Sequence, residues 1–119
     1  MVDSIVSKKA TAFALRIVNM YKYLTLKASQ KEFVLSKQVL RSGTSIGANI
    51  EEALRGQSKA DFVAKMNISL KEACETRYWL KLLRDSDYLE HAAANSILTD
   101  CDEIIRMLKS IVKTTNERR

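Results

Sequence analysis

The stretch RSGTSIGANIEEALRG, residues 41–56, contains all three glycines of the 119-residue chain and begins with an arginine. Glycines beside a basic residue are typical of a loop that cradles a phosphate group. Such a loop follows a β-strand and has the pattern G-x-x-x-x-G-K-[ST] or G-x-G-x-x-G, because its backbone N–H groups must approach the phosphate. This stretch has neither pattern, and the hydrophobic spacing around it is helical. We therefore predict that it is not a phosphate-binding loop.

Side chains that could carry out acid–base or metal chemistry do not converge in the sequence. The single histidine, His91, is not part of a Glu-x-x-His pair, which a di-iron helical bundle requires. Asp100, Asp102 and Glu103 are close in sequence, but neighbouring side chains on a helix point in different directions. We expect these carboxylates to form a solvated face.

The other reactive groups are interpreted as structural. Cys74 and Cys101 lack the spacing of metal ligands, and we expect both to be small buried residues. We expect a further set of carboxylates to pair with Arg41, Arg55 or Arg77 across helices: Glu52, Glu72 and Glu75. The sequence thus predicts no catalytic residue, no metal site and no cofactor, and a protein that is not an enzyme.

The net charge of +6 lies in the first half of the chain. Residues 1–50 carry eight Lys and Arg against Asp3 and Glu32, whereas residues 51–119 carry twelve basic and twelve acidic residues. A basic face of this kind can bind phosphate backbones without reading sequence. The alternative is a solvated basic face with no ligand. The predicted nucleic-acid contacts lie on the first helix and its end: Lys8, Lys9, Arg16, Lys22, Tyr23 and Lys27.

Four segments have the hydrophobic period of helices, and they would position these residues. Apolar side chains recur at steps of three and four over about 4–26, 31–54, 58–83 and 90–115. The absence of proline favours long, uninterrupted helices. We predict one domain over residues 1–119, an all-α, antiparallel up-down-up-down four-helix bundle.

The sequence also contains signals for where helices begin and end. Asp3 or Ser4 would be the N-cap of the first helix, and Ser58 with Asp61 would form a capping box for the third. Gly56 follows the second helix at the C′ position.

The second helix has a broader contact face than one side of a bundle requires. Beside its core stripe, Leu40, Gly43, Gly47 and Leu54 form a second stripe. Each glycine inside a helix costs about 1 kcal/mol relative to alanine, so we expect another backbone to come very close. We also expect this helix to contact its own bundle on one side and something else on the other. The predicted packing and oligomer-interface residues are Gln38, Arg41, Gly43, Ser45, Gly47, Asn49, Glu52 and Trp79. For Trp79, packing at the edge of the core is the alternative.

A longer pattern spans the second and third helices. It reads Gln38-x-x-Arg41-x-x-x-Ser45-Ile46-x-x-Asn49-Ile50-x-Glu52, then Arg55, Ser58, Phe62 and Ser69-Leu70-x-Glu72. It resembles the bacterial four-helix-bundle family that includes proteins encoded by intervening sequences in large-subunit ribosomal RNA genes. That family is often labelled a ribosomal protein family, and the retroelement accessory variability protein looks related to it. The chain departs from the family at Gly47, where many members have proline, and at Ala53, where they have glycine.

The resemblance implies a homopentameric ring of bundles, with nucleic-acid binding suspected and no general catalytic activity. We expect a non-enzymatic, oligomeric scaffold that binds RNA or DNA through its first two helices. The alternative is a protein-only adaptor that binds a partner protein without nucleic acid. The first 25 residues do not resemble a signal peptide, and no apolar run is long enough to span a bilayer. We therefore expect a cytoplasmic protein with no membrane partner.

Overall fold

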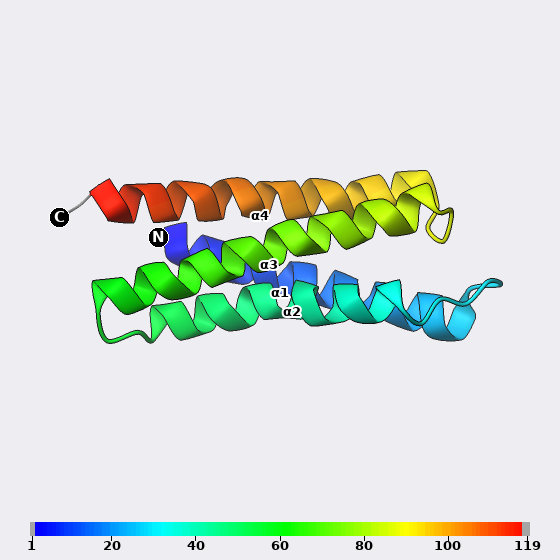
Figure 1. Ribbon diagram of the computed structural model, residues 1–119, viewed down its shortest axis with the longest axis horizontal. Helices are drawn as coiled ribbons and strands as arrows, with labels where there is room; N and C mark the ends of the chain where they lie inside the picture. The colour runs from blue at the N-terminus through cyan, green and yellow to red at the C-terminus, as the bar shows by residue number, and fades with distance from the viewer. Residues whose placement is uncertain (1, 118–119) are drawn as a thin grey trace.

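The computed structural model describes residues 2–117, with side chains described from residue 4 onward, and its elements are all helices joined by short connections (Figure 1). No strand occurs in the described residues, which confirms the all-α prediction. The elements are α1 (Val2–Lys22), the short π-helix η1 (Tyr23–Lys27), α2 (Leu35–Leu54), α3 (Lys59–Asp85) and α4 (His91–Glu117).

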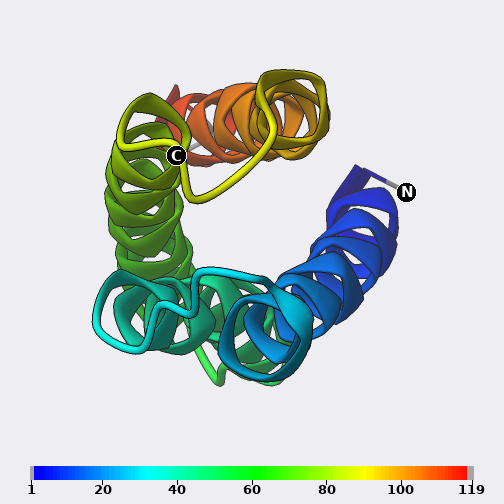
Figure 2. The same cartoon turned by 90° about the vertical axis from the view of Figure 1, so that its right-hand side faces the viewer.

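Consecutive α-helices run in opposite directions along a body of 53 × 21 × 20 Å (Figure 1). Viewed from one end, they follow one another around the bundle in the order α1, α2, α3, α4 (Figure 2). The closest packing is between α2 and α3, and the sparsest is between α1 and α4. The four helices therefore pack against one another in antiparallel fashion, with one side left more open than the rest.

The hydrophobic period places the core as expected. The apolar side chains that recur at alternating steps of four and three over 4–26 form a stripe along α1 and into η1, and all six are buried: Val6, Ala10, Phe13, Ile17, Met20 and Leu24. Met66 and Leu80 of α3 and Leu108 of α4 are fully buried opposite them. Ala93 is an exception, because it faces the open side between α1 and α4 and is exposed instead of lying in the core.

Buried hydroxyl groups join α2 to α3. The Oγ1 atom of Thr76 lies 2.8 Å from the Oγ atom of Ser42, and Ser69 donates to the backbone oxygen of Ile46 at 2.8 Å. All three hydroxyl side chains are fully buried. Each such group would cost free energy if it lacked a hydrogen bond. These small, paired side chains let the two helices approach closely without leaving a polar atom unsatisfied.

The start of α2 is fixed by a carboxylate. The Glu32 side chain accepts hydrogen bonds from the backbone N–H groups of Val34, Leu35 and Ser36 at 2.7–3.0 Å. Burial raises the pKa of Glu32, but these backbone hydrogen bonds outweigh burial and the pKa is lowered. The predicted start near residue 31 was therefore too early, because Glu32 caps the helix and leaves residues 28–34 as a connector.

The two glycines inside α2 face α1. A Cβ atom built on Gly43 would lie 3.0 Å from the Cγ1 atom of Ile17. One built on Gly47 would lie 3.6 Å from the Cβ of Ala10 and 3.8 Å from its backbone. The close backbone that we expected is thus α1 of the same chain. Gly43 and Gly47 are packing residues within the bundle, and α1 covers this side of α2.

Three helix ends test the capping predictions. Ser58 is the N-cap of α3 and accepts from the backbone N–H of Asp61 at 3.1 Å, as predicted. Asp3 and Ser4 were wrong as N-caps of α1, since the helix begins at Val2 and contains both. Acidic and hydroxyl residues suit the first helical turn as well as the cap. Gly56 occupies the predicted position after α2 but has no positive φ, and its Cβ would meet Ala53 and Asp61.

Candidate interaction surfaces

One candidate surface lies on the outer side of α2 and α3. We call it the Arg41 surface and define it by six residues at helical spacing on α2 and α3: Gln38, Arg41, Ser45, Asn49, Glu52 and Trp79. Gln38, Arg41 and Glu52 are exposed, and the other three are half-buried. These are the predicted interface residues other than the two glycines.

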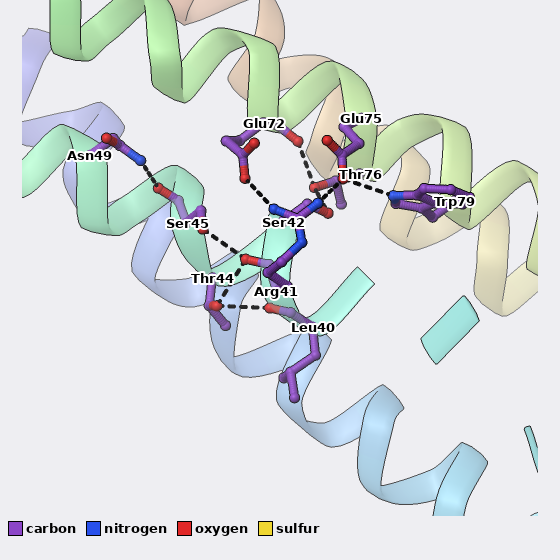
Figure 3. Close-up of polar contacts among 10 residues, drawn as sticks. All are labelled: Leu40, Arg41, Ser42, Thr44, Ser45, Asn49, Glu72, Glu75, Thr76 and Trp79. Atoms are coloured by element: carbon purple, nitrogen blue, oxygen red, sulfur yellow. Dashed lines mark hydrogen bonds and ion pairs between the residues drawn. The ribbon is translucent and has the colours of Figure 1, made fainter. Parts of the chain in front are cut away.

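A cross-helix ion-pair network lies at the centre of this surface (Figure 3). The Nη1 atom of Arg41 is 3.2 Å from Glu72 Oε2, and its Nη2 atom contacts Glu75. The indole Nε1 of Trp79 donates to the same Glu75 carboxylate at 3.0 Å. This arrangement confirms the prediction that Glu72 and Glu75 serve as partners for Arg41. Trp79 packs against the core edge, as the alternative for that residue stated.

Three more polar side chains of α2 on this surface are held in place: Ser45, Asn49 and Glu52. Ser45 donates to the backbone oxygen of Arg41, and Asn49 donates to the backbone oxygen of Ser45, both at 2.8 Å (Figure 3). Glu52 pairs with Lys65 of α3 at 3.0 Å, so the expectation of an arginine partner for it was wrong. The surface is therefore a pre-ordered polar patch, which loses little side-chain entropy when a partner docks on it.

Groups that could carry out chemistry remain dispersed in the fold. Within residues 2–117, no set of His, Cys, Asp and Glu side chains is arranged to hold a metal ion. His91 is exposed and lies 3.7 Å from Asp87. Burial raises the pKa of the Cys101 thiol to about 12, so this thiol stays protonated and unreactive at neutral pH. Cys74 is exposed, and the expectation that it is buried was wrong because its position on α3 faces outward.

The predicted row of basic residues on α1 divides into two groups. Lys9 pairs with Glu103 at 2.8 Å, and Arg16 pairs with Asp100 at 2.6 Å, so both cations bridge α1 to α4. Asp102 pairs with Arg77 of α3 at 2.7 Å. The three α4 carboxylates are thus partners in ion pairs on a partly solvated face, and the pairing was not predicted. Sequence reasoning could not see these partners, which lie on helices distant in the chain.

The rest of the predicted basic residues are exposed. Among the described residues, no carboxylate lies within 4.0 Å of Lys8, Lys22 or Lys27. Tyr23 is 47% exposed and borders a hollow of about 490 Å³ between α1 and α4, beside Glu90. Lys8, Lys22 and Lys27 are therefore exposed cations without an ion-pair partner among the described residues, and Tyr23 shares its hollow with the carboxylate of Glu90.

A second candidate surface, the connector surface, surrounds the chain between η1 and α2. It combines lysines with large apolar side chains: Lys22, Leu26, Lys27, Lys31, Phe33, Val34 and Lys37. Leu26, Phe33 and Val34 are 69%, 58% and 71% exposed. Sequence reasoning singled out none of the three, and it placed Phe33 and Val34 inside the second helix. No sequence signal marked the later helix start, because Glu32 is not among the preferred N-cap residues.

None of the helices in residues 2–117 combines the length and apolar character that a membrane span requires.

A family model described as 23S rRNA-intervening sequence protein matches residues 2–110. A solved structure of a protein with unknown function from the S23 ribosomal protein family of Bacteroides thetaiotaomicron is 53% identical to the chain. The match covers 95% of this chain and 99% of that one, with a TM-score of 0.90. Comparison with curated proteins finds no match.

Proposed function

The chain belongs to the 23S rRNA-intervening sequence protein family, and from that premise we propose that it is a non-enzymatic, self-assembling scaffold that binds RNA or DNA. The observation that carries the proposal is a set of exposed lysines on α1, η1 and the connector: Lys8, Lys22, Lys27 and Lys31. No carboxylate among the described residues lies within ion-pair distance of them. Unpaired cations of this kind supply the affinity of a protein for a phosphate backbone.

The binding is electrostatic and independent of sequence. The phosphate contacts come from Lys8, Lys22 and Lys27, while Lys9 and Arg16 hold α1 to α4 through their carboxylate partners. Phosphate contacts position a protein on nucleic acid but carry no base information. Different RNAs of equal length are therefore expected to bind with similar affinity.

Self-assembly uses the Arg41 surface. The family resemblance implies a ring of five bundles, and this pre-ordered patch of polar side chains with a half-buried tryptophan supports an intersubunit role. A ring would repeat the lysines around its axis, so weak contacts would add through avidity.

Light scattering tests the assembly. We expect a mass near five times 13.5 kDa at micromolar concentration, and a smaller mass for Ser45→Arg, which places a long charged side chain in the centre of the Arg41 surface. Thr99→Arg, at an exposed position of α4, is the matched control. A wild-type mass of 13.5 kDa would refute self-assembly, and an unchanged mass for Ser45→Arg would refute this interface.

Fluorescence anisotropy at several salt concentrations tests the nucleic-acid binding. Lys22→Gln with Lys27→Gln is expected to weaken duplex binding and to reduce the slope of log affinity against log salt by roughly 1.8, at about 0.9 per lost phosphate contact. Lys109→Gln with Lys113→Gln removes the same charge from exposed positions on α4. Equal effects of the two double variants would contradict the site, and no wild-type binding even at low salt would contradict the function.

A protein-only adaptor is the second candidate function. The three large apolar side chains of the connector surface favour it, because exposed apolar patches often mark protein contacts. The absence of nucleic-acid binding in the titration above would make it the leading function.

A further inference from the structure

The connector surface places an exposed aromatic ring among lysines. We infer that it binds single-stranded nucleic acid, with the Phe33 ring stacking on an unpaired base and Lys31 and Lys37 contacting the phosphates on either side. This inference rests on the proposed nucleic-acid function and deepens it by naming the form of nucleic acid that is preferred.

The exposure of Phe33 is the first observation. Its side chain is 58% exposed and has no polar group of its own, whereas Phe13 is 1% exposed in the core. Burying a phenylalanine side chain contributes about 1.5–3 kcal/mol, and Phe33 gains only part of this within the chain. A base has an apolar face of matching shape, and an aromatic ring accepts any base because every base has such a face.

The charge around the ring is the second observation. Lys31 precedes Phe33 by two residues, Lys37 follows it by one helical turn, and both are exposed. The nearby carboxylate of Glu32 is 8% exposed and accepts three backbone hydrogen bonds at the start of α2. It therefore faces inward rather than competing with a phosphate, and Lys31 and Lys37 are the exposed charges nearest Phe33 in the sequence. Asp87 and Glu90 border the connector at residues 28–30, where they line a hollow with it.

The connector is also held rigidly, which is the third observation. The backbone N–H of Glu32 donates to Leu24 at 3.0 Å, and that of Ala28 donates to Tyr23 at 2.8 Å. Ala28 is itself 5% exposed, and Lys31 Nζ donates to its backbone oxygen at 3.3 Å. A ring presented from an ordered segment loses less entropy on binding than one presented from a mobile loop.

A single strand fits this surface better than a duplex or a second protein. Bases in a duplex stack on one another, so their faces are not free to contact Phe33. A protein partner would need carboxylates facing these lysines, and a second copy of the connector surface would present lysines to lysines. A single strand supplies both the free base and the phosphates.

Anisotropy with a labelled oligouridine of about 16 nucleotides tests the inference, alongside the equivalent oligothymidine and an RNA duplex of equal length. Phe33→Ala is expected to weaken single-strand binding by about 5- to 150-fold and to leave duplex binding unchanged. Phe33→Tyr is expected to retain the affinity. Lys31→Gln with Lys37→Gln is expected to weaken binding of both forms. Tyr78→Ala is the matched control, since Tyr78 of α3 is 57% exposed. If Phe33→Ala weakens binding of oligouridine and oligothymidine alike, an unpaired base and a phosphate are sufficient for recognition. If it weakens binding of only one of them, the site is assigned to RNA or to DNA.

A second readout reports stacking directly. Phe33→Trp in a Trp79→Phe background leaves one indole in the chain, at the connector. Its emission is expected to be quenched on saturation with oligouridine and unchanged with the duplex. A purely structural role of Phe33 would not produce this difference.

The outcomes separate this inference from the proposed function. If the wild type binds single strands and duplexes but Phe33→Ala binds both with unchanged affinity, the stacking inference is wrong and the electrostatic function stands. If Phe33→Ala changes the mass in light scattering without changing affinity, the connector is a protein contact and the inference is overturned. If the wild type binds neither form at low salt, both fail.

Discussion

Two contacts between helices, the α2–α3 seam and the α1–α4 seam, lie at opposite sides of the bundle and are built from different interactions. Between α2 and α3, fully buried side chains and paired hydroxyls such as Ser42 and Thr76 hold the helices close. Between α1 and α4, the helices pack sparsely beside a hollow, and the exposed ion pairs of Lys9 and Arg16 bridge them. Exposed ion pairs contribute little to stability. We conclude that the α2–α3 seam contributes more to stability than the α1–α4 seam.

The largest expected difference between the seams is in the cost of a core deletion. Ile46→Ala, at a fully buried position of α2, is expected to lower the free energy of unfolding by about 2–5 kcal/mol. Ile97→Ala is the matched change in α4, beside the hollow between α1 and α4. It is expected to cost less, because the side chain is 7% exposed and its surroundings can relax. Equal losses in urea unfolding would contradict the comparison.

The α1–α2 contact is expected to give the next largest effect. Gly47→Leu inserts a side chain where a Cβ atom would already lie 3.8 Å from the Ala10 backbone, and overpacking of this kind costs about 1–3 kcal/mol. Ala48→Leu adds the same side chain at the next, exposed position. Thermal unfolding should show a lower Tm for the first variant only. The same Tm for both would mean that α1 does not constrain α2 here.

Glu32 gives an effect of about 0.5–2 kcal/mol, the range for loss of a helix cap. Glu32→Gln should be less stable than the wild type at neutral pH. Because the pKa of Glu32 is lowered on folding, its contribution is present above the unfolded-state pKa and is lost as pH falls through the folded-state value. The two stabilities should therefore converge on acidification in urea unfolding at several pH values. Glu117→Gln, at an exposed position of α4, should show no such trend.

These comparisons also show what could be predicted from the sequence. The α1 stripe containing Phe13 and Ile17 follows from hydrophobic period alone, and the Ser58 cap follows from a local pattern. The start of α2 was misplaced because Glu32, which is not among the preferred N-cap residues, provides the cap. The contact of Gly47 with α1 depends on how whole helices pack against one another. No local sequence rule predicts that packing.

The candidate surfaces divide in the same way. The α2 residues of the Arg41 surface were identified from their spacing on one helix, and Glu72 was predicted as a partner of Arg41 from its charge. The pairing of Lys9 with Glu103 spans 94 positions of the chain, so a count of charges in the first half treated Lys9 as free. The connector surface was missed because the exposure of Phe33 depends on where α2 begins, and that start was predicted too early.

The smallest expected effect concerns the ion pair between Arg16 and Asp100. Its side chains are 39% and 45% exposed, so a double-mutant cycle with Arg16→Gln and Asp100→Asn should give a coupling of about 0.2–1 kcal/mol. The coupling should decrease as salt is added, because salt screens exposed charges. A coupling above this range, or one that is independent of salt, would mean that the α1–α4 seam is not the weaker one. The same salt series is also a control for the binding experiments, in which the salt concentration is varied. If the pair contributes so little, helical content followed by circular dichroism should stay constant over the salt range that weakens binding. A loss of affinity in that range then reports on phosphate contacts and not on separation of α1 from α4.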